Sequence, residues 1–313
     1  MLNYILRRTL YAVPIVLGVI VLTFLLFRVV QTPESIATMV LGPKATRQAK
    51  DDFIKREGLD KPKGVQLAEH VRKLVTFDLG TSWKTGRDLS EVFIKGAGPS
   101  LMITVPGFFV GLITAVGLAL YQVFVRNSLL DRGMTVAAVA LMSVPTVVYI
   151  IVLQAIGALM LNYFPASGFD WRGLGTLKFV ALPILVIVIV NLGYDARLYR
   201  AIFIEEIGQD YIRTARAKGV SPTRVLTVHV LKNGMIALIT LTVAHLPALI
   251  MGSLLIENFF GIPGLGNTLV MAIQTGDLPV VMASVYLGSL LYVASLILTD
   301  IAYALADPRI RLS

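Results

Sequence analysis

Long apolar stretches alternate with short polar segments along the whole chain. Six stretches with almost no charged side chains approach or exceed the roughly 20 residues that a helix needs to cross a bilayer. They are Thr9 to Val30, Ser100 to Val125, Met134 to Leu161, Phe179 to Tyr194, Asn233 to Ile256 and Leu278 to Thr299. The fourth is short, so we expect it to continue as a helix past Asp195 through "ARLYRAIFIEEIG". The pattern predicts an all-α, polytopic membrane protein with six transmembrane helices.

Details within these stretches support that prediction. The first follows Arg7 and Arg8 but is too long for a signal peptide and lacks a small-residue cleavage site, so we expect it to be retained. Prolines inside the stretches are tolerated in membranes, where neighbouring helices satisfy the freed carbonyl groups. The predicted kinks lie at Pro106, Pro145, Pro183 and Pro247.

Composition agrees with a membrane location. The chain is 56% hydrophobic, and only 15% of its residues are charged, against roughly 25% in soluble domains. In a membrane protein a net charge of +9 indicates basic cytoplasmic loops rather than nucleic-acid binding. The absence of cysteine excludes disulfides and thiolate catalysis. The histidines His70, His229 and His245 lack the spacing of metal ligands, so we expect no metal site and no catalytic residue.

The distribution of Lys and Arg predicts that both termini are cytoplasmic, because short cytoplasmic loops are enriched in these residues. The cytoplasmic segments then hold Arg7, Arg8, Arg126, Arg132, Arg197, Arg200, Arg213, Arg216, Lys218, Arg224, Lys232, Arg309 and Arg311, whereas the short outer loops hold Arg172 and Lys178. The long outer segment from Gln31 to Gly98 is also basic, but long loops translocate largely regardless of charge.

Three regions follow from this topology. Residues 1–30 form the cytoplasmic N-terminus and first span, residues 31–98 an extracytoplasmic segment, and residues 99–313 the core membrane domain with a cytoplasmic loop at 195–232. The pattern "LDKPKGVQLAEHVRKLVTFDLG" predicts an amphipathic helix in the extracytoplasmic segment. A solvated cap and a docking surface are both consistent with that segment.

The loop from Asp195 to Lys232 is densely charged, and each charge would cost about 2.5 to 3.5 kcal/mol at the centre of a membrane helix. Asp210 and Lys218 stand at the two ends of "DYIRTARAK", as a helix dipole favours. Gly219 can take the left-handed conformation that ends a helix. Ser221 and Pro222 follow as a helix cap and first helical residue. The loop is therefore predicted as helix, stop, helix.

The short helix is amphipathic. Tyr211, Ile212 and Ala215 lie on one side, with basic groups around them from Arg213, Arg216 and Lys218. Such a helix can rest on anionic lipid or insert into the groove of a partner.

The segment "EEIGQDYIRTARAKGVSPTRVLTVHVLKNGM" closely resembles the EAA loop of binding-protein-dependent ABC importer permeases, in the form of the dipeptide and oligopeptide (peptide/nickel) family. "YILRRTLYAVPIVLGVIVLTFLLFR", "GLDKP" with "DLGTSWKTGRDLSEVF", and the C-terminal third with "PGLG" and "DPRIR" resemble the same family. Two departures stand out. The chain has "QTPES" where the family usually has a "PGDP"-like turn, and "KNGMIALIT" lacks a Leu-Pro pair, which predicts a straighter start to the fifth span with Pro247 as its nearest kink.

The resemblance implies a permease of a bacterial inner membrane that pairs with a second related permease, two ABC ATPases and an extracytoplasmic solute-binding protein. ATP and Mg would be used by the ATPases, and this chain would be neither an enzyme nor a cofactor carrier. It contains no GxxxxGK phosphate loop, and "GIPGLG" is better interpreted as an outer turn in a re-entrant or gate segment. The implied coupling residues are Glu205, Glu206, Gly208, Asp210, Tyr211, Arg213, Thr214, Ala215, Arg216, Ala217, Lys218 and Gly219.

Polar residues inside the spans are candidates for the translocation path or a gate, because such residues usually face a cavity or another helix. They are Gln154, Asn191, His245, Ser253 and Glu257, with Asp300 near the end of the sixth span. Hydrogen bonding between helices is the competing interpretation for each. "GFFVG", Gly107 to Gly111, is a packing signal.

The resemblance leaves the substrate open among peptides, nickel and oligosaccharides, and peptides are expected. Two other classes fit less well. An ion-coupled secondary transporter would have repeated halves, discontinuous helices and paired buried carboxylates. An intramembrane enzyme would need a nucleophile and base at membrane depth, which His245 alone does not provide.

Overall fold

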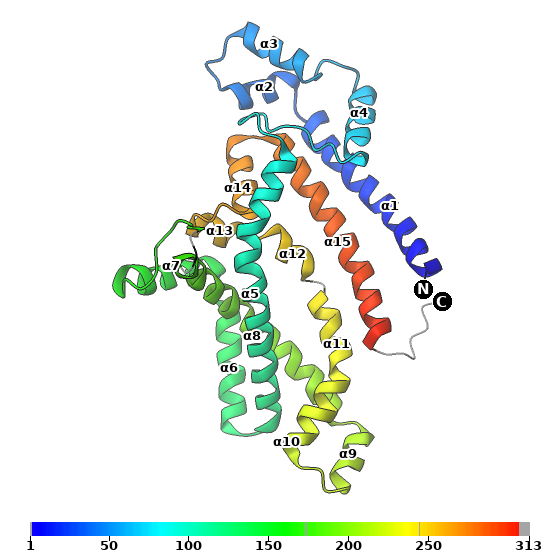
Figure 1. Ribbon diagram of the computed structural model, residues 1–313, viewed down its shortest axis with the longest axis vertical. Coiled ribbons are helices and arrows are strands. Elements are labelled where there is room, and N and C mark those ends of the chain that lie inside the picture. The colour runs from blue at the N-terminus through cyan, green and yellow to red at the C-terminus, as the bar shows by residue number, and fades with distance from the viewer. Residues whose placement is uncertain (1, 172, 174, 244, 307–313) are drawn as a thin grey trace.

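The structure, a computed structural model, describes the backbone of residues 2–171, 173, 175–243 and 245–306, and the side chains of those from 10 to 299. The predictions for Arg7, Arg8, Arg172, Asp300, Arg309 and Arg311 lie outside the described side chains. The molecule is elongated, with the helices α2 to α4 at one end and α9 at the other (Figure 1). The described residues form helices and no strand, apart from one β-bridge between Thr81 and Asp88.

Five helical segments are long and apolar enough to span a membrane. They are α1 (Leu2–Phe24) with its π-helical continuation (Leu25–Val29), α5 (Leu89–Phe124), α8 (Gly175–Ile207), the run from α10 (Pro222–Arg224) through a π-helix (Val225–Val230) to α11 (Leu231–Val243), and α15 (Leu278–Ala306). The all-α polytopic prediction is therefore confirmed. The fourth apolar stretch does continue past Asp195, because α8 extends to Ile207.

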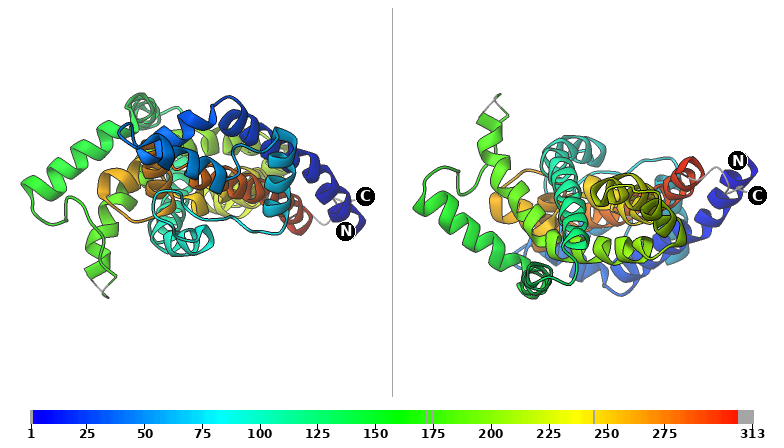
Figure 2. Two further views of the ribbon diagram at one scale, coloured as in Figure 1. Left: turned by 90° about the horizontal axis from the view of Figure 1, so that it is seen from above. Right: turned by 90° about the horizontal axis from the view of Figure 1, so that it is seen from below.

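Two helix pairs are apolar but sharply bent. α6 (Leu129–Ser143) and α7 (Thr146–Gln154), which a π-helix extends over Ala155–Met160, meet at 94°. The kink predicted at Pro145 is in the right place, but it is a break: Val144 is extended and Pro145 caps α7. Figure 2 shows α6, α7 and the start of α8 reaching to one side of the molecule, away from α1.

The prediction of one span from Asn233 to Ile256 was wrong. α11 ends at Val243, and three short helices follow: α12 (Leu246–Met251), α13 (Leu254–Phe260) and α14 (Leu265–Thr275). Gly252, with φ of +76°, separates α12 from α13, and the α12–α13 segment meets α14 at 69°. Pro247 stands in the first turn of α12, just after the break that follows Val243, and the start of the span contains a π-helical turn over Val225–Val230. The "GIPGLG" sequence forms the turn between α13 and α14, as predicted.

The second span begins eleven residues earlier than Ser100, at Leu89. The carboxylate of Asp88 explains this start, because it accepts hydrogen bonds from the backbone N–H groups of Ser90 (2.8 Å) and Glu91 (3.3 Å). Pro99 and Pro106 lie inside α5 without ending it. The helix therefore runs from the polar segment that precedes it through the apolar region without interruption.

The segment between α1 and α5 folds as a cap of three helices. In it α2 (Pro33–Leu41) and α3 (Arg47–Arg56) share a small core that includes Ile36, Phe53 and Leu59, and α4 (Lys63–Val75) packs against α1. The predicted amphipathic helix is α4. The unusual "QTPES" turn starts α2, since the Thr32 hydroxyl accepts the Ser35 N–H. Asp277, before α15, fastens the cap by accepting hydrogen bonds from the Ser82 hydroxyl (2.5 Å) and the Trp83 N–H (3.0 Å).

α5 packs along α8 at the centre of the molecule. Small buried residues of α5, including Gly107 and Gly111, allow the close approach. A methyl group on Gly107 would lie 2.9 Å from the side chain of Ile187. The packing role predicted for "GFFVG" is confirmed, and this helix pair forms one wall of the site described next.

Candidate functional site

α9 (Asp210–Ala217) forms the far end of the molecule, and its two boundaries are well defined. Before it, the N–H groups of Gly208 and Gln209 close the end of α8 on the carbonyls of Glu205 and Glu206, each at 3.2 Å. After it, Gly219 has φ of +79° and donates to the Arg216 carbonyl at 2.9 Å. Val220 donates to the Ala215 carbonyl at 3.2 Å, which completes a Schellman motif. The predicted glycine stop is confirmed.

A second helix follows the stop. Ser221 is extended and Pro222 begins α10, as predicted, but the Ser221 side chain makes no capping hydrogen bond. Its carbonyl accepts the Val225 N–H instead, at 2.9 Å. Two short joints therefore connect α9 to α8 and to α10, the start of the helical run that ends with α11.

The apolar face of α9 is already occupied by the chain itself. Ile212 is fully buried and belongs to the core that contains Phe203 of α8 and Val225 and Leu226 beyond the loop. Ala215, on the same side of α9, is also buried. Neither side chain is free to rest on lipid or to enter a partner's groove. The apolar side of this helix positions it on the bundle.

The opposite face of α9 is exposed and polar. It presents Asp210, Tyr211, Arg213, Thr214, Arg216, Ala217, Lys218 and Gly219. Arg213 pairs with Asp210 at 3.2 Å in full contact with water, an arrangement that contributes little to stability. Tyr211 donates to the Glu206 carboxylate, and the partial burial of Tyr211 together with this hydrogen bond raises its pKa to about 12. This face is the surface that a partner could contact.

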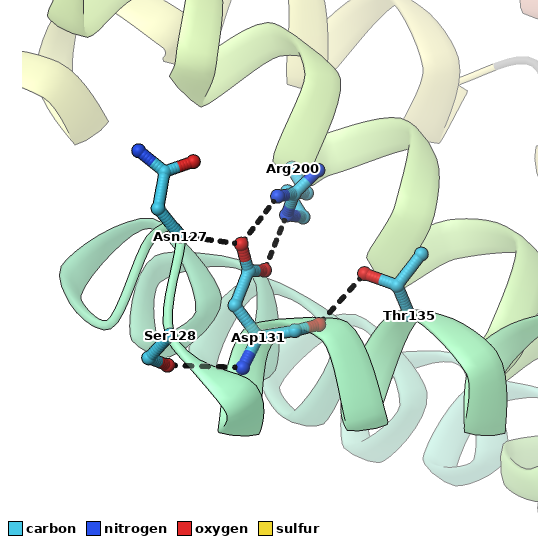
Figure 3. Close-up of polar contacts among 5 residues, drawn as sticks. All are labelled: Asn127, Ser128, Asp131, Thr135 and Arg200. Carbon is cyan, nitrogen blue, oxygen red and sulfur yellow. Dashed lines mark hydrogen bonds and ion pairs between the residues drawn. The ribbon is translucent and has the colours of Figure 1, made fainter.

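An ion pair connects α8, the helix that precedes α9, to the neighbouring hairpin formed by α5 and α6 (Figure 3). Arg200 of α8 donates two hydrogen bonds to the buried carboxylate of Asp131, from Nε at 3.1 Å and from Nη2 at 2.8 Å. The backbone N–H of Asn127 also donates to the Asp131 carboxylate. Ser128 caps α6, because its hydroxyl oxygen accepts the backbone N–H of Asp131. Sequence reasoning counted Arg200 only as a cytoplasmic charge and missed this contact.

A cavity of about 480 Å³ lies beside the middle of α5, between α5, α8, α12 and α13. Three of the five predicted path residues line it: Asn191, His245 and Ser253. Thr104, Tyr199 and Asp195 also line it, although sequence reasoning did not select them. Asn191, Asp195 and Tyr199 are spaced by four residues and so lie on one face of α8. This four-residue spacing in the sequence could have identified Asp195 and Tyr199 as neighbours of Asn191 on the cavity wall.

Asp195 is the acidic group of this cavity. Its carboxylate makes no hydrogen bond or ion pair with the described part of the chain, and its electrostatic neighbours there are His245 and Tyr199. Asn191 donates its amide to the Ile187 carbonyl at 2.8 Å, which leaves its side-chain oxygen without a donor among the described residues. No three His, Asp or Glu side chains gather as a metal site in the described side chains.

Gln154 and Glu257, the other two predicted path residues, do not line the cavity. Gln154 donates to the carbonyls of Ala166 (2.8 Å) and Phe259 (3.2 Å). It therefore connects α7 to the loop before α8 and to α13, in agreement with the competing interpretation of a hydrogen bond between segments. Glu257 is fully buried in the first turn of α13. It accepts hydrogen bonds from the Ser100 hydroxyl (2.8 Å) and from the N–H groups of Ser253 (3.0 Å) and Asn267 (3.1 Å).

Gly252 makes the Glu257 arrangement possible. A methyl group at this position would lie 2.0 Å from the Glu257 carboxylate, and the backbone has a positive φ. The carboxylate therefore closes the bend between α12 and α14 against α5. A glycine is required where the chain passes this closely.

Comparison with known proteins relates this architecture to transport. Residues 107–312 match the family described as binding-protein-dependent transport system inner membrane component, and residues 1–85 match the N-terminal region of such membrane components. The chain belongs to this family. It is therefore a multi-pass membrane component of a binding-protein-dependent transport system, and the predicted resemblance is confirmed.

Individual relatives cover nearly the whole chain. A putative peptide transport system permease protein of Brucella abortus is 34% identical over 310 residues, 98% of each chain. The oligopeptide transport system permease protein AppB of Bacillus subtilis is 30% identical over 316 residues, and the glutathione transport system permease protein GsiC of Salmonella typhi is 33% identical over 312 residues, each at 99% coverage of both chains. The permease organisation thus extends over the cap as well as the core.

Proposed function

We propose that this chain is one of two related permease subunits of an ATP-driven importer, and that its substrates are peptides. The relatives named for peptide, oligopeptide and glutathione transport support the substrate class. In this assembly two ABC ATPases use ATP and Mg, a solute-binding protein delivers the peptide on the cap side, and both termini of this chain are cytoplasmic. Nickel and oligosaccharides are the alternatives within the same family.

The observation that carries the coupling role is the arrangement of α9. Its apolar face is buried on the bundle and its polar face points outward between two hydrogen-bonded joints. A partner that moves α9 therefore moves α8 and the start of α11 with it. Of the implied coupling residues, Ala215 supports α9 from inside, and the contacts to an ATPase come from the exposed positions, above all Arg213, Arg216 and Lys218.

The cavity beside α5 is the part of the translocation path that this subunit contributes. It is bordered by a broken helix, and broken helices within a membrane are tolerated where they line a cavity or are buried in protein. Asn191, His245 and Ser253 face the substrate in this proposal. Gln154 and Glu257 hold the surrounding segments.

Reconstitution tests the proposal directly. The complete importer in proteoliposomes should accumulate a labelled peptide only with ATP, the ATPases and the binding protein. Gly219→Pro, which cannot adopt a positive φ and removes the N–H bonded to Arg216, should lower uptake by about tenfold or more while ATP hydrolysis continues. The double charge reversal Arg213→Glu with Arg216→Glu should have the same effect.

Gly219→Ala is the matched control. It keeps the N–H group and should retain much of the uptake, since a single alanine with positive φ costs about 1 kcal/mol. Uptake that persists without ATP or without the ATPases would contradict the proposed class. Normal uptake together with normal ATPase co-purification in the Gly219→Pro importer would contradict the coupling role of the loop.

A further inference from the structure

We propose that the carboxylate of Asp195 binds the free α-ammonium group of a peptide as it passes through the cavity. This inference rests on the proposed peptide function and names the subsite that receives one end of the substrate. Four observations carry it.

The first observation is that the Asp195 carboxylate has no partner among the described residues. Asp195 lies on the cavity wall without a hydrogen bond or ion pair to the described residues. Carboxylates removed from bulk water are costly unless paired. The chain nevertheless offers Asp195 no basic side chain from the described cavity lining except His245. A cationic substrate group supplies the missing partner.

The second is the number of acceptors. An ammonium group has three donors and no acceptor. The Asn191 side-chain oxygen, one helical turn from Asp195, is left available because its amide is committed to Ile187. The carboxylate and this oxygen therefore offer acceptors from one face of α8. A divalent metal, in contrast, needs several oxygen or nitrogen ligands, and no such cluster exists among the described side chains.

The third is the shape of the site. Its volume of about 480 Å³ falls within the roughly 300 to 1,000 Å³ typical of small-molecule sites. Most of the remaining lining is apolar and includes Phe108, Leu112, Ile187 and Val190. This surface suits peptide side chains of different sizes. One charged anchor in an otherwise apolar cavity fixes an end that all unblocked peptides share, without selecting among their side chains.

The fourth is the interruption of the helix opposite Asp195. His245 and Ser253 stand at the two ends of the short helix α12, next to the breaks in the apolar segment. Discontinuous helices in transporters place backbone polar groups at substrate sites near the middle of the membrane. The broken segment and the unpaired carboxylate are independent features, and they meet at the same cavity.

The test uses the complete importer in proteoliposomes with labelled trialanine. Asp195→Asn keeps the size of the side chain and removes its charge, and it should lower the initial uptake rate by about tenfold, the effect of losing one charge-assisted hydrogen bond. Asp195→Glu retains the charge and should stay within about threefold of the unmodified rate. ATP hydrolysis stimulated by the loaded binding protein should be unchanged in both variants.

Matched controls separate the outcomes. Asp60→Asn removes an exposed carboxylate of the cap, far along the chain from the cavity, and should leave uptake unchanged. Normal uptake by Asp195→Asn, or equal losses in Asp195→Asn and Asp195→Glu, would overturn the ammonium assignment alone. If the unmodified importer hydrolyses ATP but does not accumulate trialanine, the peptide function fails and the assignment fails with it.

Discussion

Glu257 and Asp195 are two carboxylates within the membrane domain, and their surroundings are opposite. Glu257 is fully buried and accepts hydrogen bonds from Ser100, Ser253 and Asn267. Asp195 borders an open cavity and has no hydrogen-bond partner among the described residues. The difference indicates which acid maintains the fold and which is available to a ligand. Sequence position alone does not distinguish them.

The largest effect is expected at Glu257. Glu257→Gln preserves the shape, but its NH₂ group faces backbone N–H groups that need an acceptor. We expect a loss of about 4 kcal/mol in the free energy of unfolding, typical of a broken buried network. Thermal unfolding of the purified importer in detergent measures it. Ser100→Ala, which removes one of the partners, should cost about 1 kcal/mol, and an unchanged midpoint in Glu257→Gln would contradict the structural role.

Asp131 is a second carboxylate whose hydrogen bonds are made within the protein, because it pairs with Arg200, and it can be compared with Asp195 in the same way. Asp131→Asn or Arg200→Met should each lower the free energy of unfolding by about 3 kcal/mol, because each leaves a largely buried charge unpaired. The double variant should lose less than the sum of the two, since neither charge then remains. A double-mutant cycle on the unfolding midpoints checks this. Additive losses would mean that the two side chains are not coupled.

His70, in α4 of the cap, is a partly buried titratable group and so extends the comparison beyond the carboxylates. Its Nε2 is buried and has no hydrogen-bond partner in the described structure, and its ring lies 6.0 Å from that of Phe24. Burial, with smaller contributions from the positive charges of Arg28 and Lys73, lowers the pKa of His70 to about 4. An unfolded histidine has a pKa of about 6.5.

The sign of the pH effect follows from these pKa values. Above about pH 6.5 His70 is neutral in both states and contributes no pH dependence. Between about pH 6.5 and 4 the unfolded chain binds the proton first, so stability falls as the pH falls. The unfolding midpoint of His70→Gln should decline less over this window than that of the unmodified importer. Parallel pH profiles would show that His70 titrates normally.

The smallest effect is expected at Asp195. Asp195→Asn breaks no hydrogen bond of the described structure, so it should lower the free energy of unfolding by no more than about 0.5 kcal/mol. The same thermal measurement applies to it and to Glu257→Gln. A large destabilisation at Asp195 would remove the contrast between the two acids and would indicate a packing role.

Local signals predicted the loop well. Gly219, Ser221 and Pro222 act through their own backbone conformations, so the stop and restart of the helix could be predicted without knowing the tertiary structure. The burial of Ile212 and Ala215 on the bundle could not, because amphipathicity does not tell which surface covers an apolar face. The chain itself covers it.

Long-range contacts limited the prediction of the membrane site. Ser100 is 157 positions from Glu257, and no local pattern joins them. Hydropathy could not predict the break after Val243 either, because the short helices of a broken span are as apolar as one intact helix. Asp195 was taken as the end of a span because it is charged. Its position one helical turn from Asn191 and from Tyr199 was the better guide.

The continuity of α8 has a mechanical consequence. From Asp195 to Ile207 the helix is unbroken, a rigid arm of about 18 Å at about 1.5 Å per residue, and Arg200 holds it to the neighbouring hairpin part-way along. In the proposed coupling, a tilt imposed at the α9 end is therefore carried by the same unbroken helix to the cavity wall. The position of α9 and the shape of the cavity are therefore linked through the same helix.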